Sequence, residues 1–316
     1  AFTLTTNVDT IPGMIGSNGT ASTAGDVTIN SVLAGTNSTL NIFDTINAGT
    51  GVNTININTA NTDPAALGFA NIPLLTNLQK VNLQNYDFDG GVAFDASVAP
   101  QITTLGLVRQ IGDGSFTTNN ALGTLNAFVI NNLQLDDTDI DVNYTAGQLA
   151  GAADAVAVAL TDVKAATVDE DNSTEISLDG GAVGQGFETV NLTVTSESRL
   201  GDLLVRDSAG TSTIKTLNVS GAGSLRIFDA LDFKDTTGTI NASSSTGEVW
   251  LRVGTENITY TGGSGNDRLD FEGVGDFNNS DVINFGAGTN TIGLDDITYS
   301  TELYALINGV STAQRL

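Results

Sequence analysis

Apolar and polar residues alternate one by one over short segments along almost the whole chain. Residues 53–58, 155–160 and 189–194, for example, read NTININ, AVAVAL and TVNLTV. A period of two predicts β-strands with one buried face. Clusters of Gly, Asn, Ser and Asp separate these segments, and a total of 4 prolines leaves the turns to glycine and to Asn and Asp side chains. The pattern therefore predicts an all-β protein.

One phrase recurs in the predicted strands, with Asn between two aliphatic residues, in the segments 78–83, 187–192 and 214–219. Equivalent asparagines such as Asn191 and Asn218 recur loosely, at a period of about two dozen residues. This period predicts a β-solenoid of the parallel β-helix or β-roll type, in which stacked coils bury their aliphatic side chains against one another. Stacked Asn side chains would form hydrogen-bonded ladders. An antiparallel β-sandwich is the alternative.

The regularity of the strand pattern changes along the chain, and this change suggests two regions. Residues 1–145 are expected to form an N-terminal, β-rich, solenoid-like region with irregular insertions. Residues 146–316 are expected to form a C-terminal β-solenoid. One continuous solenoid is equally compatible with the pattern.

Composition restricts the function. The chain of 316 residues has 11 Lys+Arg against 36 Asp+Glu, a formal charge of −25, and no basic run, which excludes a nucleic-acid binder. No apolar stretch reaches the roughly 18 residues needed to cross a bilayer, so membrane insertion is not expected. The absence of His and Cys excludes imidazole or thiolate zinc sites and His-dependent nucleophiles. A metal ion would have to be a hard cation bound by oxygen.

The most specific motif is residues 262–270, GGSGNDRLD, which fits the nonapeptide G-G-x-G-x-D-x-U-x at every defined position. Glycines permit a tight turn with inward carbonyls, and the Asp supplies a carboxylate. Because Ca²⁺ takes six to eight oxygens, one turn makes half a site and the next coil completes it. Degenerate copies follow this motif and also occur near the start of the chain. The predicted ligands in these turns are Gly263, Gly265, Asp267, Asp270, Asp276, Asp281, Asn290, Asp44 and Asn53. Ordinary Gly-Asn turns are the alternative.

Two further groups of charged residues are candidates for binding. Asp137, Asp139 and Asp141 alternate and would share one strand face, where a calcium ion would relieve their repulsion. Arg206, Arg226 and Arg252 stand in strand-like segments, and in a solenoid they would form one ladder that contacts an anionic polysaccharide or an acidic subunit. Simple pairing of these arginines with local aspartates is the alternative.

Three segments together resemble the RTX-type, calcium-binding bacterial surface-layer and adhesin proteins. They are the nonapeptide, the phrase FETVNL at 187–192, and the opening LTTNVDTI at 4–11 followed by DTINAGTG at 44–51. The resemblance covers most of the chain at low stringency and is weakest over 86–145. It implies a calcium-stabilised β-solenoid that is exported by a type I system and assembles with copies of itself on the bacterial cell surface. RTX blocks usually carry several regular repeats in tandem, whereas this chain has one.

The sequence therefore predicts a structural, self-assembling extracellular protein that is ordered by calcium and is not an enzyme. Two alternatives stay open. The first is an RTX adhesin module that binds a surface polysaccharide, for which Trp250 beside Arg252 is the candidate aromatic contact. The second is a calcium-dependent β-helix polysaccharide lyase or epimerase, which would need a general base near the metal.

Overall fold

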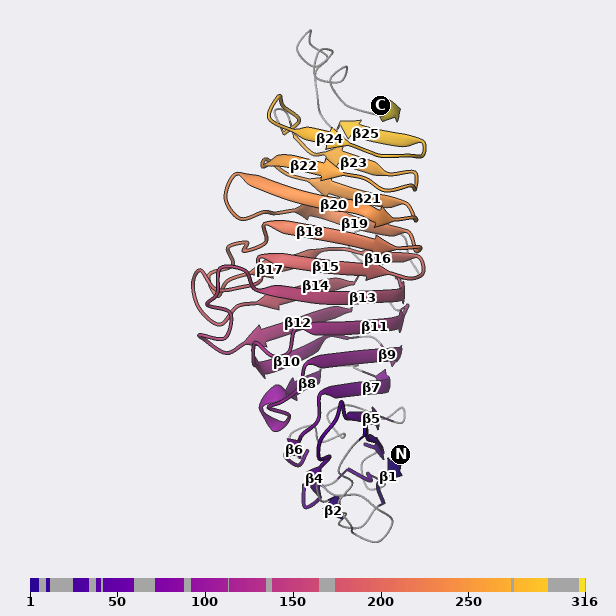
Figure 1. Ribbon diagram of the computed structural model, residues 1–316, viewed down its shortest axis with the longest axis vertical. Helices are drawn as coiled ribbons and strands as arrows, with labels where there is room; N and C mark the ends of the chain where they lie inside the picture. Colours follow the sequence, from indigo (N-terminus) through magenta and orange to yellow (C-terminus); the bar gives the residue numbers. More distant parts are fainter. Residues whose placement is uncertain are drawn as a thin grey trace.

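The computed structural model describes residues 1–5, 10–11, 25–33, 38–40, 42–59, 72–87, 92–112, 114–134, 138–164, 174–273, 276–294 and 313–315. These residues form parallel β-strands that stack in coils along one axis, from the N-terminus at one end to the C-terminus at the other (Figure 1). The predicted all-β solenoid is thus confirmed. No helix in the described part of the chain has the length and apolar character needed to cross a membrane.

One wall of the solenoid is sheet A, which has twelve strands in sequence order. They are β1 (Phe2–Thr3), β3 (Thr28–Val32), β5 (Thr54–Asn58), β7 (Lys80–Asp87), β9 (Thr104–Gly112), β11 (Ala127–Leu133), β13 (Ala155–Val163), β15 (Thr189–Val194), β18 (Thr216–Gly221), β20 (Thr237–Ser245), β22 (Asn257–Thr261) and β24 (Val282–Asn284). β11 pairs with β13 across residue 145, so the two regions share one continuous sheet.

The other strands of the coils form three shorter sheets. Sheet B contains β2 (Thr10–Ile11), β4 (Thr45–Asn47) and β6 (Leu75–Thr76). Sheet C contains β8 (Val92–Asp95), β10 (Phe116–Ala121), β12 (Asp139–Tyr144), β14 (Glu175–Asp179) and β17 (Leu203–Arg206). Sheet D contains β16 (Ser198–Leu200), β19 (Leu225–Leu231), β21 (Val249–Val253), β23 (Arg268–Phe271), β25 (Asn290–Leu294) and β26 (Ala313–Arg315). A short 3-10 helix, η3 (Ala96–Val98), follows β8.

Alternation along each strand decides which side chains fill the interior. In β5 the buried residues are Ile55 and Ile57, while the Thr and Asn between them face outward. The register aligns Ile29, Ile55 and Val81 in successive coils, so aliphatic side chains stack on aliphatic side chains. One apolar core therefore runs along the solenoid.

The predicted asparagine ladders are present on the outer face of sheet A. The Asn56 amide donates to Asn30 Oδ1 at 2.9 Å, and the Asn82 amide donates to Asn56 Oδ1 at 3.0 Å. The ladder ends where Asn82 pairs with Gly106, because glycine has no side-chain amide to extend it. A second ladder joins Asn218 to Asn191 at 2.9 Å.

Candidate functional site

The nonapeptide turn connects β22 to β23 and depends on glycine for stacking. A Cβ at Gly263 would lie 2.1 Å from the carbonyl oxygen of Ser245, and one at Gly265 would lie 2.2 Å from that of Gly247. In the next coil, a Cβ at Gly288 would lie 2.0 Å from the Gly265 carbonyl oxygen. These separations leave no room for a side chain, so successive coils approach closely at this corner because each has glycine there.

Asp267 is buried inside this turn, at 1% exposure, and its carboxylate accepts two backbone hydrogen bonds. Oδ1 accepts from the N–H of Val249 in the preceding coil, and Oδ2 accepts from the N–H of Gly263, both at 3.1 Å. Burial raises the pKa of Asp267, although these hydrogen bonds oppose the shift. The nearby Tyr260 hydroxyl is buried without a well-formed hydrogen bond to the described residues. Asp267 thus closes the turn and joins two coils.

Asn290 occupies the equivalent position one coil later. Its Oδ1 accepts the N–H of Asp267 at 2.9 Å, and its Nδ2 donates to the Ala287 carbonyl oxygen at 3.0 Å. Asn53, near the start of the chain, is likewise buried. Its Oδ1 accepts the N–H of Val27 at 2.9 Å, and its Nδ2 donates to the Gly49 carbonyl oxygen at 3.2 Å. Both asparagines therefore link coils as Asp267 does.

The remaining aspartates of the predicted calcium turns also have partners. Asp281 accepts from the N–H groups of Ile258 and Asn278 at 2.8 and 2.7 Å, and burial raises its pKa. Asp276 is buried and accepts the N–H of Gly273 at 2.8 Å. Asp44 is buried beside β4 and makes interactions of its own.

Asp270 lies on the outer face of β23 at 4% exposure and holds two side chains of sheet D. It accepts from Arg268 Nε at 2.7 Å and from Trp250 Nε1 at 2.7 Å. Across the ranges that the structure describes, no group of three or more acidic side chains is arranged to hold a metal ion. The described aspartates of the predicted calcium turns are therefore not gathered into one such group.

Sheet C carries a cluster of carboxylates that we call the acidic face, composed of Asp139, Asp141, Glu175 and Asp202. Asp139 and Asp141 share the outer side of β12, as the alternation predicts, and Asp137 lies outside the described residues. The register places Asp139 beside Glu175, and Glu175 lies next to Asp202 because Ile176 pairs with Leu203.

Like charges interact across this acidic face. Burial raises the pKa of Asp141, and repulsion by Asp139 adds to the shift. Burial also raises the pKa of Glu175, with further contributions from Asp139, Asp202 and Asp141. Arg206 opposes both shifts but is itself paired with Asp179. Carboxylates on neighbouring strands thus repel one another here, which is destabilising unless a cation lies among them.

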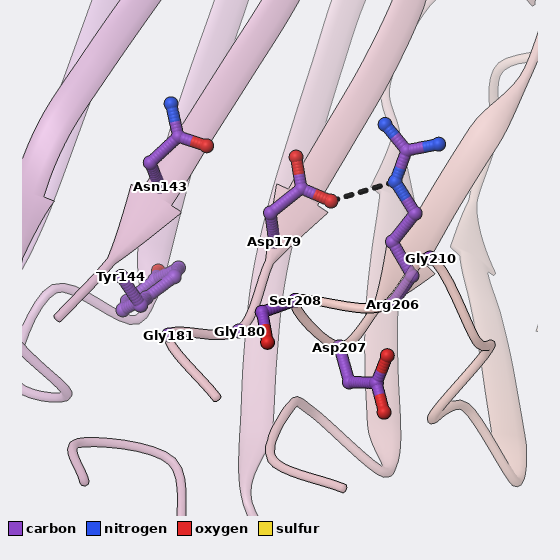
Figure 2. A pocket seen from close by; sticks show the side chains of 9 residues that line it. All are labelled: Asn143, Tyr144, Asp179, Gly180, Gly181, Arg206, Asp207, Ser208 and Gly210. Carbon is purple, nitrogen blue, oxygen red and sulfur yellow. Dashed lines mark hydrogen bonds and ion pairs between the residues drawn. The ribbon is translucent and has the colours of Figure 1, made fainter. Parts of the chain in front are cut away.

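A cavity of about 470 Å³ lies beside the end of this sheet, and Figure 2 shows its lining. The Asp179 and Arg206 side chains point toward each other, with Arg206 Nε donating to Asp179 Oδ1 at 2.6 Å. The Tyr144 hydroxyl donates to the Leu125 carbonyl oxygen at 2.6 Å, and burial raises the pKa of Tyr144. The Asp207 carboxylate accepts the N–H of Gly184 from a neighbouring loop at 2.7 Å, and this bond is the main cause that lowers the pKa of Asp207. These ionisable groups hold the loops in place.

Sheet D carries a row of basic and aromatic side chains that we call the arginine strip. Register pairs Arg199 with Arg226, Arg226 with Trp250, and Trp250 with Arg268, so the row crosses four successive strands. The Arg226 guanidinium lies 3.6 Å from the Trp250 ring centroid, and that of Arg268 lies 4.5 Å from it. The predicted ladder is therefore wrong in two members.

The two errors have physical causes. Arg206 belongs to sheet C, because its coil turns between β16 and β17 and sends that segment to another sheet. Arg252 pairs with Ala230 and not with Arg226, because the register shifts within β19. The sequence placed Arg226 within a strand, but no feature of the sequence marks the bulge that displaces Arg252.

No family model, curated protein or solved structure matches this chain in the three comparisons.

Proposed function

We propose that this chain is a structural, self-assembling protein of the bacterial cell surface, and that calcium orders it. The observation that carries the proposal is the acidic face of sheet C, where Asp139 on β12, Glu175 on β14 and Asp202 just before β17 lie side by side and repel one another. Arg206 offsets the negative charge of this wall only in part, and a rigid wall of net negative charge favours the binding of cations. The continuous solenoid supplies that rigidity, because every coil packs on the next.

Calcium would account for both the ordering of the chain and its self-assembly. Ca²⁺ prefers six to eight oxygen ligands, and carboxylates are its usual protein ligands. Since the acidic face of one copy supplies a partial set, we infer that a second copy completes the coordination and that calcium bridges the copies. The charge of −25 points the same way, because copies of this chain repel one another until cations neutralise them. An extracellular location, where calcium is abundant, is part of the same proposal.

The test is sedimentation velocity and circular dichroism of the purified chain in chelator, in millimolar Ca²⁺ and in millimolar Mg²⁺. We expect larger species with Ca²⁺, which chelator dissociates, and a weaker response to Mg²⁺. Glu175→Gln should raise the calcium concentration at the midpoint of assembly several-fold, because it removes one oxygen charge from the acidic face. Asp235→Asn removes the same charge from an exposed turn and should leave the midpoint unchanged.

Each outcome decides one part of the proposal. A monomer at every calcium concentration would overturn self-assembly. Oligomers that persist in chelator would overturn the role of calcium while leaving assembly intact. Equal midpoints for Glu175→Gln and Asp235→Asn would overturn the assignment to the acidic face.

A further inference from the structure

The arginine strip is unusual in a chain with so few basic residues. Of the 11 Lys+Arg, five are on sheet D: the strip arginines Arg199, Arg226 and Arg268, together with Arg252 and Arg315. Arg199 and Arg226 are register neighbours, and like charges in that position are destabilising unless something compensates them. In a chain with 36 Asp+Glu, this concentration of arginines calls for an explanation.

Arg226 is the centre of the strip. Its guanidinium stacks 4.0 Å from the Phe228 ring centroid and 3.6 Å from that of Trp250. It makes no ion pair with any residue that the structure describes, whereas Arg199 pairs with Glu197 and Arg268 pairs with Asp270. Burial lowers the pKa of Arg226, and the charges of Arg199, Arg252 and Arg268 add to this against the attraction of Asp270. The stacked guanidinium is thus held in place with its N–H groups available.

The surroundings of Arg226 are built around Asp270. This carboxylate is nearly buried and binds both Arg268 and Trp250, which fixes the two side chains on either side of it. Gly293 in the next coil leaves space for this pairing, because a Cβ there would lie 1.8 Å from Asp270 Oδ1. Asp270 is therefore a positioning residue for the strip.

Two hollows follow the strip. One, of about 150 Å³, is lined by Arg199, Arg226 and Trp250 among others, and the other, of about 360 Å³, is lined by Trp250 and Arg268 with Asn266, Thr289 and Thr291. Glu248 lines both. Hydroxyl and amide groups accompany the arginines, and the large exposed apolar side chains that the structure describes all lie outside sheet D.

We propose that the arginine strip binds a linear polysaccharide that carries carboxylates, with Arg226 as the central contact and with the chain running across the strands of sheet D. Arginine binds a carboxylate through two parallel N–H groups, and the Thr and Asn side chains suit sugar hydroxyls. Neighbouring strands lie about 4.8 Å apart, so the strip offers a row of contacts to a repeating ligand.

A second copy of this chain is the competing occupant, and the surface fits it less well. Protein interfaces have an apolar, fully buried core with a polar rim. Sheet D instead exposes arginines, threonines and one tryptophan, Trp250. The guanidinium groups of Arg226 and Arg268 already stack on the Trp250 ring and partly cover it. A hydrated, anionic chain matches such a surface better.

The test is isothermal titration calorimetry with oligomers of polygalacturonate, with neutral dextran as the control ligand, in low salt and with chelator present. Chelator removes any calcium bridge, so this result does not depend on the proposed assembly. We expect binding of polygalacturonate that weakens with salt and no binding of dextran. Arg226→Gln should weaken the affinity about tenfold, because it removes one charge-assisted contact. The affinity of Arg226→Lys should lie between those of the wild type and Arg226→Gln, because lysine keeps the positive charge but cannot donate two parallel N–H groups to one carboxylate.

Matched variants separate the strip from general charge effects. Arg206→Gln removes an equal charge from sheet C and should leave the affinity unchanged. Glu248→Gln should strengthen binding, because it removes the carboxylate that lines both hollows. Circular dichroism of each variant verifies folding.

Three results would overturn the proposal. They are no binding by the wild-type chain, equal losses for Arg226→Gln and Arg206→Gln, or an Arg226→Gln variant that binds polygalacturonate normally but sediments as smaller species than the wild type. The last result would assign the strip to a second copy.

Discussion

The turns that precede β5 and β23 share the pattern G-x-G-x followed by one polar residue, but that residue is Asn53 in the first and Asp267 in the second. In the first turn the carbonyl of Gly49 points at the side chain, and the Asn53 amide donates to it. In the second turn the N–H of Gly263 points at the side chain, and the Asp267 carboxylate accepts it. The choice between Asn and Asp follows the polarity of the backbone group that faces inward.

Both side chains also accept an N–H from the preceding coil, so they perform the same structural task. Asn290 follows the pattern of Asn53, since its amide donates to Ala287. The hydrogen bonds to the backbone thus give the aspartate a structural role in this turn. Burying the charged Asp267 carboxylate lowers the stability of the fold, because the carboxylate loses its hydration.

The largest expected effect comes from the glycines on which both turns depend. Gly265→Ala places a Cβ 2.2 Å from a backbone oxygen, and Gly51→Ala places one 2.7 Å from the Gly25 carbonyl at a φ of +119°. Each should lower the free energy of unfolding by about 3 kcal/mol, measured by denaturant titration. Gly184→Ala is the control, because its Cβ meets nothing within 4 Å, and it should cost about 1 kcal/mol for its positive φ. Equal losses at positions 265 and 184 would contradict the stacking argument.

A smaller effect is expected from exchanging the polar residues. Asp267→Asn turns an amide group toward one of two N–H donors and should cost about 1–2 kcal/mol at neutral pH. Asn290→Asp sets a carboxylate against the Ala287 carbonyl and should cost about 2 kcal/mol at pH 7, less when acid protonates it and restores a donor. Thermal unfolding at pH 7 and pH 5 compares the two. If Asn290→Asp is neutral at both pH values, the polarity rule is wrong.

The smallest effect expected is the pH dependence that distinguishes the charged turn. Burial raises the folded-state pKa of Asp267 above its ordinary value of 3.8, so the folded protein binds the proton more tightly than the unfolded chain. Stability should therefore rise as the pH falls from 7 toward about 4 and decline as the pH rises through the folded pKa. Asp281, Asp141 and Glu175 act in the same direction.

The measurement is the melting temperature in chelator as a function of pH. Asp267→Asn should flatten part of the slope, while Asn53→Ala should lower the curve without changing its slope, because Asn53 does not titrate. A melting temperature that falls on mild acidification would contradict the assigned direction.

The interior of the solenoid was predictable from the sequence, because each coil must bury aliphatic side chains in the same way and so repeats the same alternation. Alternation identified residues such as Ile55 and Ile57 as buried, and the recurring Asn phrase identified the Asn191–Asn218 ladder. The stacked glycine turn at Gly263 and Gly265 was also predictable, since glycine spacing is visible in one sequence.

The position of outer side chains was harder to predict. The coil containing β16 and β17 contributes to two sheets, and the bulge in β19 offsets Arg226 from Arg252. These features depend on how one coil meets the next. The nonapeptide did not reveal the partners of Asp270. Trp250 reaches it through the register between β21 and β23, and Arg268 lies two residues earlier on the same strand.

The unequal length of the coils has a mechanical consequence. Side-chain bonds that join equivalent positions span 26 residues from Asn30 to Asn56, 18 from Val249 to Asp267 and 34 from Asp154 to Glu188. A force applied along the axis would peel the coils one after another, because each is bonded mainly to its neighbours. A 26-residue coil would release about 90 Å of chain. The released length of every other coil would be proportional to its number of residues. Each rupture would then have its own extension, so a single-molecule trace would identify the coil that opened.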